Sequence, residues 1–252
     1  MDAKVVKKPR PAKLPYGYAL PQLSPLYMQP PFDYRDAWSM TIPFRSDPRA
    51  IAQWIPKPLV PDPQGMMFVT ISRFFTSGFG HYNEMLLGAI AKYRGRVVNH
   101  CLYLVLDNDI AIAAGREIWG FPKKLGRVSL GDRDGVIAGE VERGGLTVVR
   151  AAMEVGPLVP ASALGGSAEY TNLKLVPPVQ EGAAPAVMQL TSTTLSNLSL
   201  KAVYRGRATL SFAESPADRF SLIPVREVLD AYYYNADFSL GHGDVLHDYL
   251  RP

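Results

Sequence analysis

The chain has 252 residues, of which 47% are hydrophobic, and this is enough for one large domain with a substantial core. The formal net charge is only +4, and part of it lies near the N-terminus, so the charge gives little support to a nucleic-acid partner. The sequence has no apolar run long enough to span a membrane, no evident signal peptide and a single cysteine, Cys101, so we expect a cytoplasmic protein without an internal disulfide.

The N-terminal segment, residues 1–31, is basic and rich in proline, and we expect it to form an irregular arm. A single domain is expected over residues 32–252. The arm is either a partly ordered tail or a segment that wraps a neighbouring subunit. In the second case its aromatic and leucine side chains would be the anchors, namely Tyr16, Tyr18, Leu20, Leu23 and Tyr27.

The first half of the chain is predicted to contain strands joined by turns and short helices. Alternating apolar positions predict strands over residues 34–44, 65–75, 86–93 and 96–106. Asp47-Pro48 is typical of a helix N-cap followed by proline in the first turn. A glycine-punctuated turn is predicted over 77–84, and a short helix over 110–118.

The second half is dominated by strand patterns. These predict strands over residues 127–130, 136–143, 146–155, 170–175, 186–192, 198–204 and 208–212, with a last strand-like piece over 242–249. One helix is predicted over 225–232. Because strands dominate and most connections are short, we expect an α+β fold that is predominantly antiparallel, with a barrel- or cone-like sheet and a few short helices.

Residues 115–126 are the segment where a reaction suggests itself, because two lysines follow a Phe-Pro step and an apolar, aromatic run. At the ordinary lysine pKa only about one amine in 2,500 is neutral at pH 7. An amine held among apolar groups has a lower pKa, and a neutral amine can attack a ketone. Spacing alone does not establish this, since a pair of lysines in a loop is usually solvated.

This segment resembles the active-site segment of the acetoacetate decarboxylase family, whose pattern reads Gly-Arg-Glu, three residues, Tyr or Phe, then Pro-Lys-Lys-Leu. Residues 115–125 fill every one of those positions. The resemblance implies that Lys123 forms the imine, that Lys124 is its cationic neighbour, and that no cofactor is needed. Since neighbouring side chains on an extended backbone point to opposite faces, we expect desolvation by Trp119 and Phe121, rather than repulsion by Lys124, to keep the amine neutral.

The resemblance also implies helper residues. The family's Ser-Gly-x-Gly-x-Tyr-x-Glu segment is matched by residues 77–84, so Glu84 corresponds to an essential carboxylate that shuttles protons or repels a substrate carboxylate. Arg35 aligns with the family's entrance arginine, which can bind a carboxylate bidentately. The alternative for Arg35 is an ordinary salt bridge with Asp33 or Asp36.

One position departs from the family pattern, because Val69 occupies the place of a second glutamate. Related members with altered pockets use the same lysine to join pyruvate to an aldehyde and remove water, or to hydrate a 2-oxo-enoate. In such a reaction Tyr82 or Tyr249 would donate a proton. The residues expected to bind substrate are therefore Arg35, Tyr82, Trp119, Phe121 and Tyr249.

The first expectation is a carbon–carbon lyase that decarboxylates acetoacetate or a similar 3-oxo acid to a ketone and CO2. The alternative is a pyruvate aldolase-dehydratase or 2-oxo-enoate hydratase, and a remote third is a non-catalytic small-molecule-binding module. The four histidines have no metal-binding spacing, so no metal is expected. The expected partners are a small oxo acid and further copies of the chain in a homo-oligomer, with no nucleic acid and no membrane.

Overall fold

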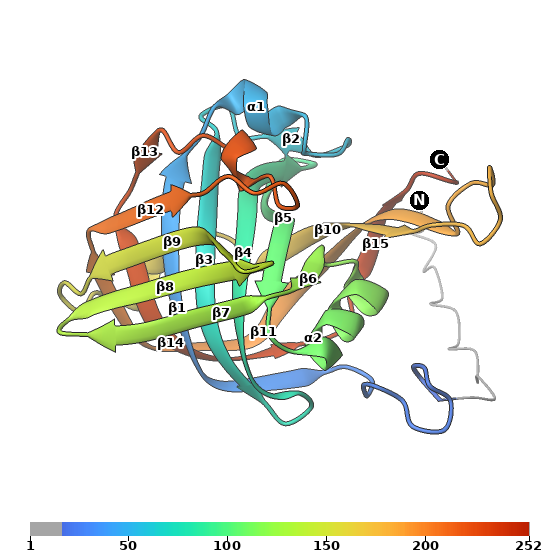
Figure 1. Cartoon of the computed structure of the whole chain (residues 1–252), viewed down its shortest axis with the longest axis horizontal. Helices are drawn as coiled ribbons and strands as arrows, with labels where there is room; N and C mark the ends of the chain where they lie inside the picture. The colour runs from blue at the N-terminus through green and yellow to red at the C-terminus, as the bar shows by residue number, and fades with distance from the viewer. Residues whose placement is uncertain (1–16, 252) are drawn as a thin grey trace, which may run out of the picture.

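The computed structural model describes residues 17–251, so Tyr16 and the basic part of the predicted arm lie outside the described residues. Strands dominate and form an 11-stranded sheet and a 4-stranded sheet (Figure 1). The strands of the large sheet are β1 (Phe32–Arg45), β2 (Val60–Pro61), β3 (Met66–Thr76), β4 (Gly80–Tyr93), β5 (Arg96–Leu106), β6 (Lys123–Leu125), β10 (Glu169–Val176), β11 (Val187–Gly206), β13 (Glu227–Val228), β14 (Ala231–Leu240) and β15 (Asp244–Asp248). Those of the small sheet are β7 (Arg127–Arg133), β8 (Val136–Arg143), β9 (Leu146–Glu154) and β12 (Ala208–Phe212). The short helical elements are α1 (Pro48–Ala52), α2 (Asp109–Ala114), the π-helical turn η1 (Gly115–Trp119), and the 3-10 turns η2 (Ala161–Leu164) and η3 (Phe220–Leu222).

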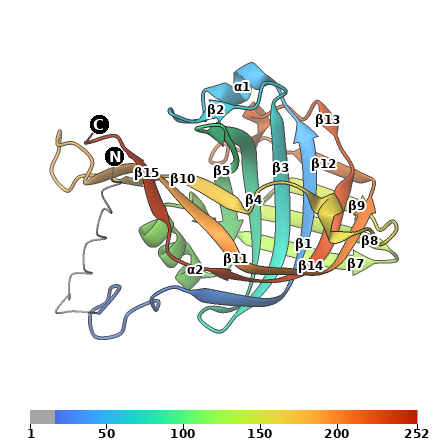
Figure 2. The ribbon, with the colours of Figure 1, turned by 180° about the vertical axis from the view of Figure 1, so that it is seen from behind.

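The large sheet closes on itself. Its strand order runs β4-β3-β1-β14-β11-β10-β5, and β4 also pairs with β5, which completes a ring. Seen from behind, β10 and β11 pass across β4 and β5 (Figure 2), so the ring has two walls and an interior. The pairings within the ring are antiparallel, except that β10 runs parallel to β5. The predicted antiparallel-rich, cone-like α+β fold is therefore confirmed.

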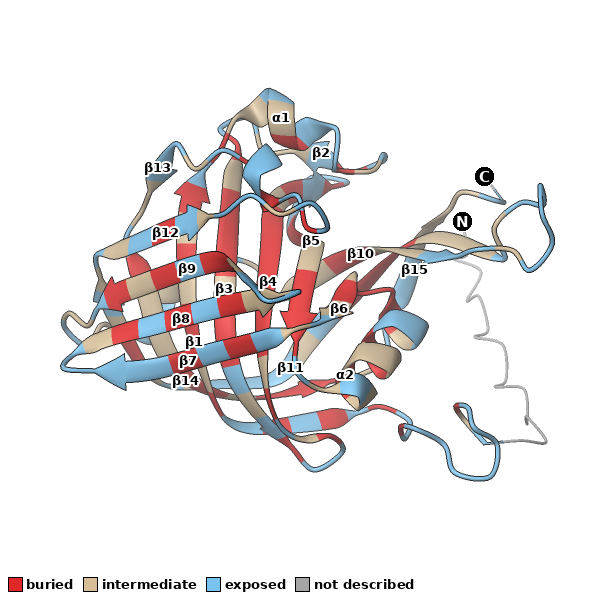
Figure 3. Cartoon of the chain, in the orientation of Figure 1, coloured by how far each residue is buried: buried red, intermediate tan, exposed pale blue. Residues whose placement is uncertain are grey.

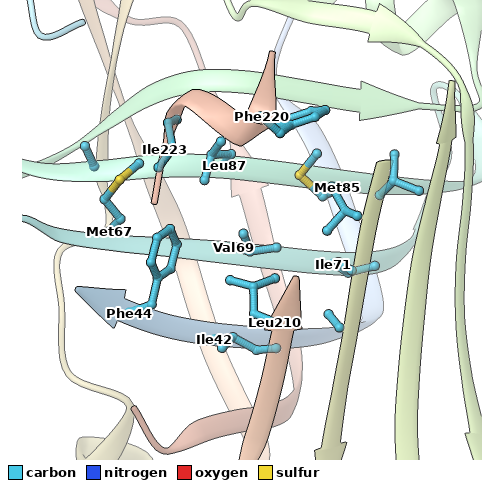
Figure 4. Close-up of a cluster of buried hydrophobic side chains, with 14 of the residues drawn as sticks. Ile42, Phe44, Met67, Val69, Ile71, Met85, Leu87, Leu210, Phe220 and Ile223 are labelled. Carbon is cyan, nitrogen blue, oxygen red and sulfur yellow. The ribbon is translucent and has the colours of Figure 1, made fainter. Parts of the chain in front are cut away.

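Buried residues concentrate in the central strands of the ring, between its interior and the small sheet (Figure 3). The outer face of β1, β3 and β4 packs against the small sheet through aliphatic side chains such as Ile42, Val69, Ile71 and Leu210 (Figure 4). The inner face carries a second cluster that is rich in aromatic side chains. Because side chains alternate along a strand, β1, β3, β4 and β5 each contribute residues to both clusters.

Several predicted elements are confirmed and others are corrected. Asp47 caps α1 as predicted, since its Oδ1 accepts hydrogen bonds from the amides of Arg49 and Ala50. The two strands predicted over 186–192 and 198–204 are one long strand, β11, with register shifts in between. The helix predicted over 225–232 is wrong, because this region contains the short strand β13 and the start of β14. Its run of three tyrosines favours a strand.

Residues 17–31 of the arm pack partly against their own chain. Tyr27 is buried, and its hydroxyl donates a hydrogen bond to Glu117 in η1. Leu20 and Leu23 are exposed. Wrapping of a neighbouring subunit by this arm stays a prediction. Within residues 17–251, no helix is both long and apolar enough to cross a membrane.

Candidate active site

Lys123 is the first residue of β6, which pairs in parallel with β5 and places Lys123 beside Leu104. Its side chain points into the ring, where Nζ lies 2.8 Å from Glu84 Oε2. Lys123 is only 7% exposed and Glu84 only 9%. The two residues expected to carry the chemistry are therefore brought together, away from bulk water.

Glu84 reaches this point because of the register of β4. It lies opposite Ser72 of β3 and Leu106 of β5, and directly paired residues share a face. Leu106 belongs to the inner cluster, so Glu84 projects into the ring as well. The segment predicted as a turn over 77–84 is thus shorter than expected, since β4 already begins at Gly80.

The Gly-Arg-Glu part of the lysine motif has a physical explanation here. A Cβ on Gly115 would lie 2.6 Å from both Cδ and Cε of Lys123, so only glycine leaves room for the lysine side chain. Arg116 Nη1 donates a hydrogen bond to the Lys123 carbonyl at 3.1 Å. Glu117 accepts one from the hydroxyl of Tyr27. The motif therefore shapes and holds the segment that presents the amine.

Two tyrosines stand next to the carboxylate. Tyr82 precedes Glu84 by two residues on the same face of β4, and its hydroxyl lies 3.2 Å from that of Tyr34. Burial raises the pKa of both phenols, and the nearby Glu84 carboxylate raises it further. Both hydroxyls are therefore neutral at ordinary pH and keep a proton that they can donate.

Aromatic rings cover the pair on the side of η1. The Phe121 ring centroid lies 5.5 Å from Lys123 Nζ, and the Trp119 and Phe121 rings are 6.0 Å apart. Trp119 Nε1 donates a hydrogen bond to the Gly241 carbonyl, which fixes the indole. Trp119 also lines a cavity of about 450 Å³ on its far side, together with Tyr27.

Lys124 is not brought into the site, although its neighbour is. Its Nζ lies 2.9 Å from Oδ1 of Asp218, which Arg143 also contacts at 3.2 Å. Burial lowers the pKa of Lys124, and the positive charge of Arg143 lowers it further. Lys124 therefore faces away from Lys123, and the expectation that desolvation outweighs the influence of Lys124 stays a prediction.

Two predicted substrate-binding residues are also placed elsewhere. The Arg35 side chain is 52% exposed, and Arg35 contacts Asp33 and the carbonyl of Tyr34, which is the salt-bridge alternative. Tyr249 packs against the outer cluster, and its hydroxyl bonds to the Lys57 carbonyl. Neither residue lies beside Lys123.

Val69 does not face the ring interior, contrary to expectation. Val69 is fully buried in the outer cluster, on the face of β3 opposite to the one that carries Ser72 (Figure 4). An apolar residue at this position therefore says nothing about the charge or the size of the ring interior. The support that Val69 gave to aldol or hydratase chemistry is lost.

The cavity of about 540 Å³ that opens on the outer face is not the reactive site. Its lining is mainly apolar and includes Leu87, Leu173 and Leu222, but neither Lys123 nor Glu84. The candidate active site is therefore identified by the contact between Lys123 and Glu84, and not by the volume of a cavity. Among residues 17–251, no group of three or more histidine, cysteine or acidic side chains is placed to bind a metal ion.

Three polar residues that were not predicted lie on the wall of the ring that β10 and β11 form. Tyr170 and Asn172 lie on β10, and Thr193 lies opposite Tyr170 on β11. The available signal was the unusual presence of asparagine inside a predicted strand, because asparagine is depleted in strands.

The family model described as acetoacetate decarboxylase matches residues 15–250. Acetoacetate decarboxylase 2 of Mesorhizobium japonicum is 32% identical over 242 residues, which cover 93% of this chain and 90% of that protein. The structure of acetoacetate decarboxylase from Legionella pneumophila superposes with a TM-score of 0.85 at 25% identity, covering 90% of this chain and 91% of the other. The enduracididine biosynthesis enzyme MppR, complexed with the condensation product of pyruvate and imidazole 4-carboxaldehyde, gives a TM-score of 0.82 at 19% identity, covers 95% of this chain and 100% of its own, and shows the shared fold.

Proposed function

The chain belongs to the acetoacetate decarboxylase family, and from this premise we propose that it is a Schiff-base lyase in which the Lys123 amine attacks the carbonyl of a small oxo acid. The observation that carries the proposal is the buried contact between Lys123 Nζ and Glu84 Oε2 at 2.8 Å. A lysine that served only as surface charge would have no reason to be 7% exposed.

The first step requires the amine to lose a proton. Glu84 is the acceptor within hydrogen-bond distance, so the proton can pass directly from nitrogen to carboxylate without water. The neutral amine then adds to the ketone carbon of a 3-oxo acid. The resulting carbinolamine loses its hydroxyl group as water, with a proton returned by the Glu84 carboxyl, and becomes a protonated imine.

The imine nitrogen then acts as an electron sink. The bond between the carboxylate carbon and its neighbour breaks, CO2 leaves, and the electron pair moves into an enamine. Protonation of the enamine carbon and addition of water to the imine release the ketone and restore the Lys123 amine. Glu84 is a carboxylate again at this stage, so the proton for the enamine carbon is taken up from solvent and delivered through Glu84 or the neutral hydroxyl of Tyr82, whose partner is Tyr34.

Decarboxylation of acetoacetate or a similar 3-oxo acid is the first choice for the reaction. The negative charge of Glu84 beside Lys123 favours loss of the substrate's own negative charge as neutral CO2. Joining of pyruvate to an aldehyde by the same lysine stays the alternative, now without the support of Val69. A non-catalytic binding module is the third outcome.

Product analysis tests the proposal. Incubation with acetoacetate should release CO2 and acetone, and Lys123→Met should abolish both, whereas Lys92→Met, which removes an exposed lysine of the same sheet, should not. Glu84→Gln should lower turnover by about a hundredfold or more, the usual range for loss of a general acid–base group. Absence of CO2 together with a new enone absorbance from pyruvate plus an aldehyde would replace decarboxylation by the alternative. Failure of both reactions would leave the binding module.

A further inference from the structure

Unpaired polar groups lie on one wall of the ring. In the part of the chain that the structure describes, four buried side-chain atoms have no hydrogen-bond partner, and three of them belong to Asn172 and Thr193. Asn172 is 0% exposed, and both its amide nitrogen and its amide oxygen are unpaired. Thr193 is 2% exposed, and its hydroxyl is unpaired as well.

Both side chains face the interior of the ring. Thr193 pairs with Tyr170, and Asn172 follows Tyr170 by two residues, so all three share one face of the β10–β11 wall. That face is the inner one. Tyr170 packs against the inner cluster, which also contains Tyr82 and Leu106, the neighbours of Glu84 on and beside β4.

The register of β10 against β5 then locates Asn172. Tyr170 pairs with Asn99 and Thr171 with His100, so the next residue, Asn172, comes beside Cys101. Cys101 belongs to the inner cluster together with Leu104, the residue of β5 that pairs with Lys123.

The loop that precedes Lys123 confirms this position from the other side. A Cβ on Gly120 would lie 2.5 Å from Cα of Lys174, so the loop touches β10 two residues beyond Asn172. Asn172 itself lies opposite Thr191 of β11, whose hydroxyl donates a hydrogen bond to the Trp119 carbonyl in the segment that leads to Lys123.

An unpaired amide at this depth is unfavourable for the folded protein alone. A buried donor or acceptor that finds no partner loses its hydrogen bonds to water without replacement, and an apolar side chain of the same shape would avoid that cost. The outer face of the same ring is filled with aliphatic side chains, so the fold itself does not require polar groups. An unpaired buried polar group in a native structure calls for an explanation, and a functional role is one of those that such groups have.

We propose that Asn172 is a substrate-binding residue that donates a hydrogen bond from Nδ2 to the carboxylate of the oxo acid bound at Lys123, with the Thr193 hydroxyl as a second donor. This inference rests on the proposed function. It assigns the carboxylate to the β10–β11 wall and not to Arg35, which lies on the surface. The preferred ligand is therefore a small oxo acid with a free carboxylate near its carbonyl.

A neutral amide suits decarboxylation better than a cation would. An arginine would neutralise the carboxylate and hold it, whereas an amide orients the group and leaves its negative charge intact. The carboxylate keeps its tendency to leave as CO2. By fixing the carboxylate, Asn172 also sets the angle between the breaking bond and the imine plane, on which transfer of the electron pair depends.

Two ketones that differ in a carboxylate distinguish binding of the carboxylate by Asn172 from a purely structural role of this residue. Acetoacetate and acetone form imines with the same lysine, but only acetoacetate carries a carboxylate. We expect Asn172→Leu to weaken acetoacetate binding about tenfold, measured as KM or as half-saturation of cyanoborohydride trapping, and to change half-saturation by acetone less than twofold. Asn172→Asp should weaken acetoacetate further, because a second negative charge then faces the carboxylate.

Two controls complete the experiment. Ser46 carries the remaining unpaired buried hydroxyl, outside the ring, so Ser46→Ala should leave both ketones unaffected. The thermal midpoint of Asn172→Leu should not fall below that of the native protein, because an unpaired amide has been removed. Equal weakening of acetoacetate and acetone, or no change in either, would overturn the role of Asn172 while the imine itself forms. If the native protein forms no imine with either ketone, the proposed function fails and this inference falls with it.

Discussion

Lys124 Nζ lies 2.9 Å from Asp218 Oδ1, on the face of β6 opposite to the one that carries the Lys123 side chain. Asp218 is 1% exposed and is also held by Arg143 and by the hydroxyl of Tyr103. Arg143 in turn donates to the Leu125 carbonyl, at the end of β6. The second lysine therefore fastens a three-residue strand to the rest of the protein.

This arrangement predicts the effect of removing either partner. Lys124→Met and Asp218→Asn should each lower turnover of acetoacetate by about tenfold to a hundredfold, because β6 then presents the Lys123 amine in a less well-defined position. The double variant should lose little more than either single variant, since both break the same contact. Steady-state kinetics of the three variants, with circular dichroism to confirm folding, measures this.

Asp218→Asn distinguishes two roles of Lys124, namely anchoring β6 and repelling the charge of Lys123. The variant removes the anchor but keeps the positive charge of Lys124. If repulsion between the two lysines activated Lys123, this variant would retain native turnover and only Lys124→Met would lose it. That pattern would contradict the fastening role.

Gly115 has helical backbone angles, with φ of −62°, so it is needed for space and not for an unusual conformation. We expect Gly115→Ala to lower turnover by about a hundredfold, because the new Cβ displaces Cδ and Cε of Lys123. Gly131→Ala is the matched control, since nothing lies within 4 Å of its added Cβ. Native activity in Gly115→Ala would show that the lysine does not follow this path.

Val69→Glu tests which face of β3 this residue occupies. A carboxylate there would be buried among aliphatic side chains without a partner, and we expect a loss of about 4 kcal/mol or more in the free energy of unfolding. The same substitution at the exposed Val60 should change stability by less than about 0.5 kcal/mol. If Val69→Glu unfolds with native stability, the side chain reaches a polar interior and the assignment to the outer face is wrong.

His100 gives the protein a defined pH dependence. It is 2% exposed, and burial lowers its pKa to about 4, against the opposing hydrogen bond with Thr171. In the unfolded chain His100 has an ordinary pKa near 6.5, so as the pH falls the unfolded state binds a proton before the folded state does. The free energy of unfolding is therefore unaffected by His100 above about pH 6.5 and decreases as the pH falls towards 4. At pH 4 this effect lowers the free energy of unfolding by about 3 kcal/mol.

Denaturant unfolding of the native protein and of His100→Gln at pH 7 and pH 4 measures this contribution. The native protein should lose about 3 kcal/mol more than the variant between the two pH values. Parallel losses in the two proteins would mean that His100 is charged in the folded state.

Most of the fold could be predicted from the sequence because its strands alternate strongly. The strand over 96–106 has the predicted bounds, and the caps and turns around Asp47 and Gly144-Gly145 also follow local rules. The predictions of secondary structure fail where pairing with distant strands, and not local sequence, determines the structure. The region 225–232 has no clear period, and β6 is only three residues long, so its pairing with β5 leaves no local signal.

Site residues that belong to a recognisable sequence motif could be predicted. Residues whose position depends on the pairing register of the strands could not. Lys123, Glu84, Tyr82, Trp119 and Phe121 come from the two recognisable segments, and the structure places them together around the ring interior. Which face Val69 occupies depends on a single-residue register, because a shift of one position reverses every side chain. Asn172 could not be assigned from the sequence, since its proximity to Cys101 depends on the parallel pairing of β10 with β5.

Covalent trapping at Lys123 tests the central claim most directly. The native protein is incubated with acetoacetate and cyanoborohydride, digested, and the modified peptide is identified by mass spectrometry. We expect a stable adduct on Lys123, formed in preference to Lys124 and the surface lysines, and greatly reduced in Glu84→Gln. A protein that decarboxylates acetoacetate without any adduct on Lys123, or with the adduct on Lys124, would contradict this claim.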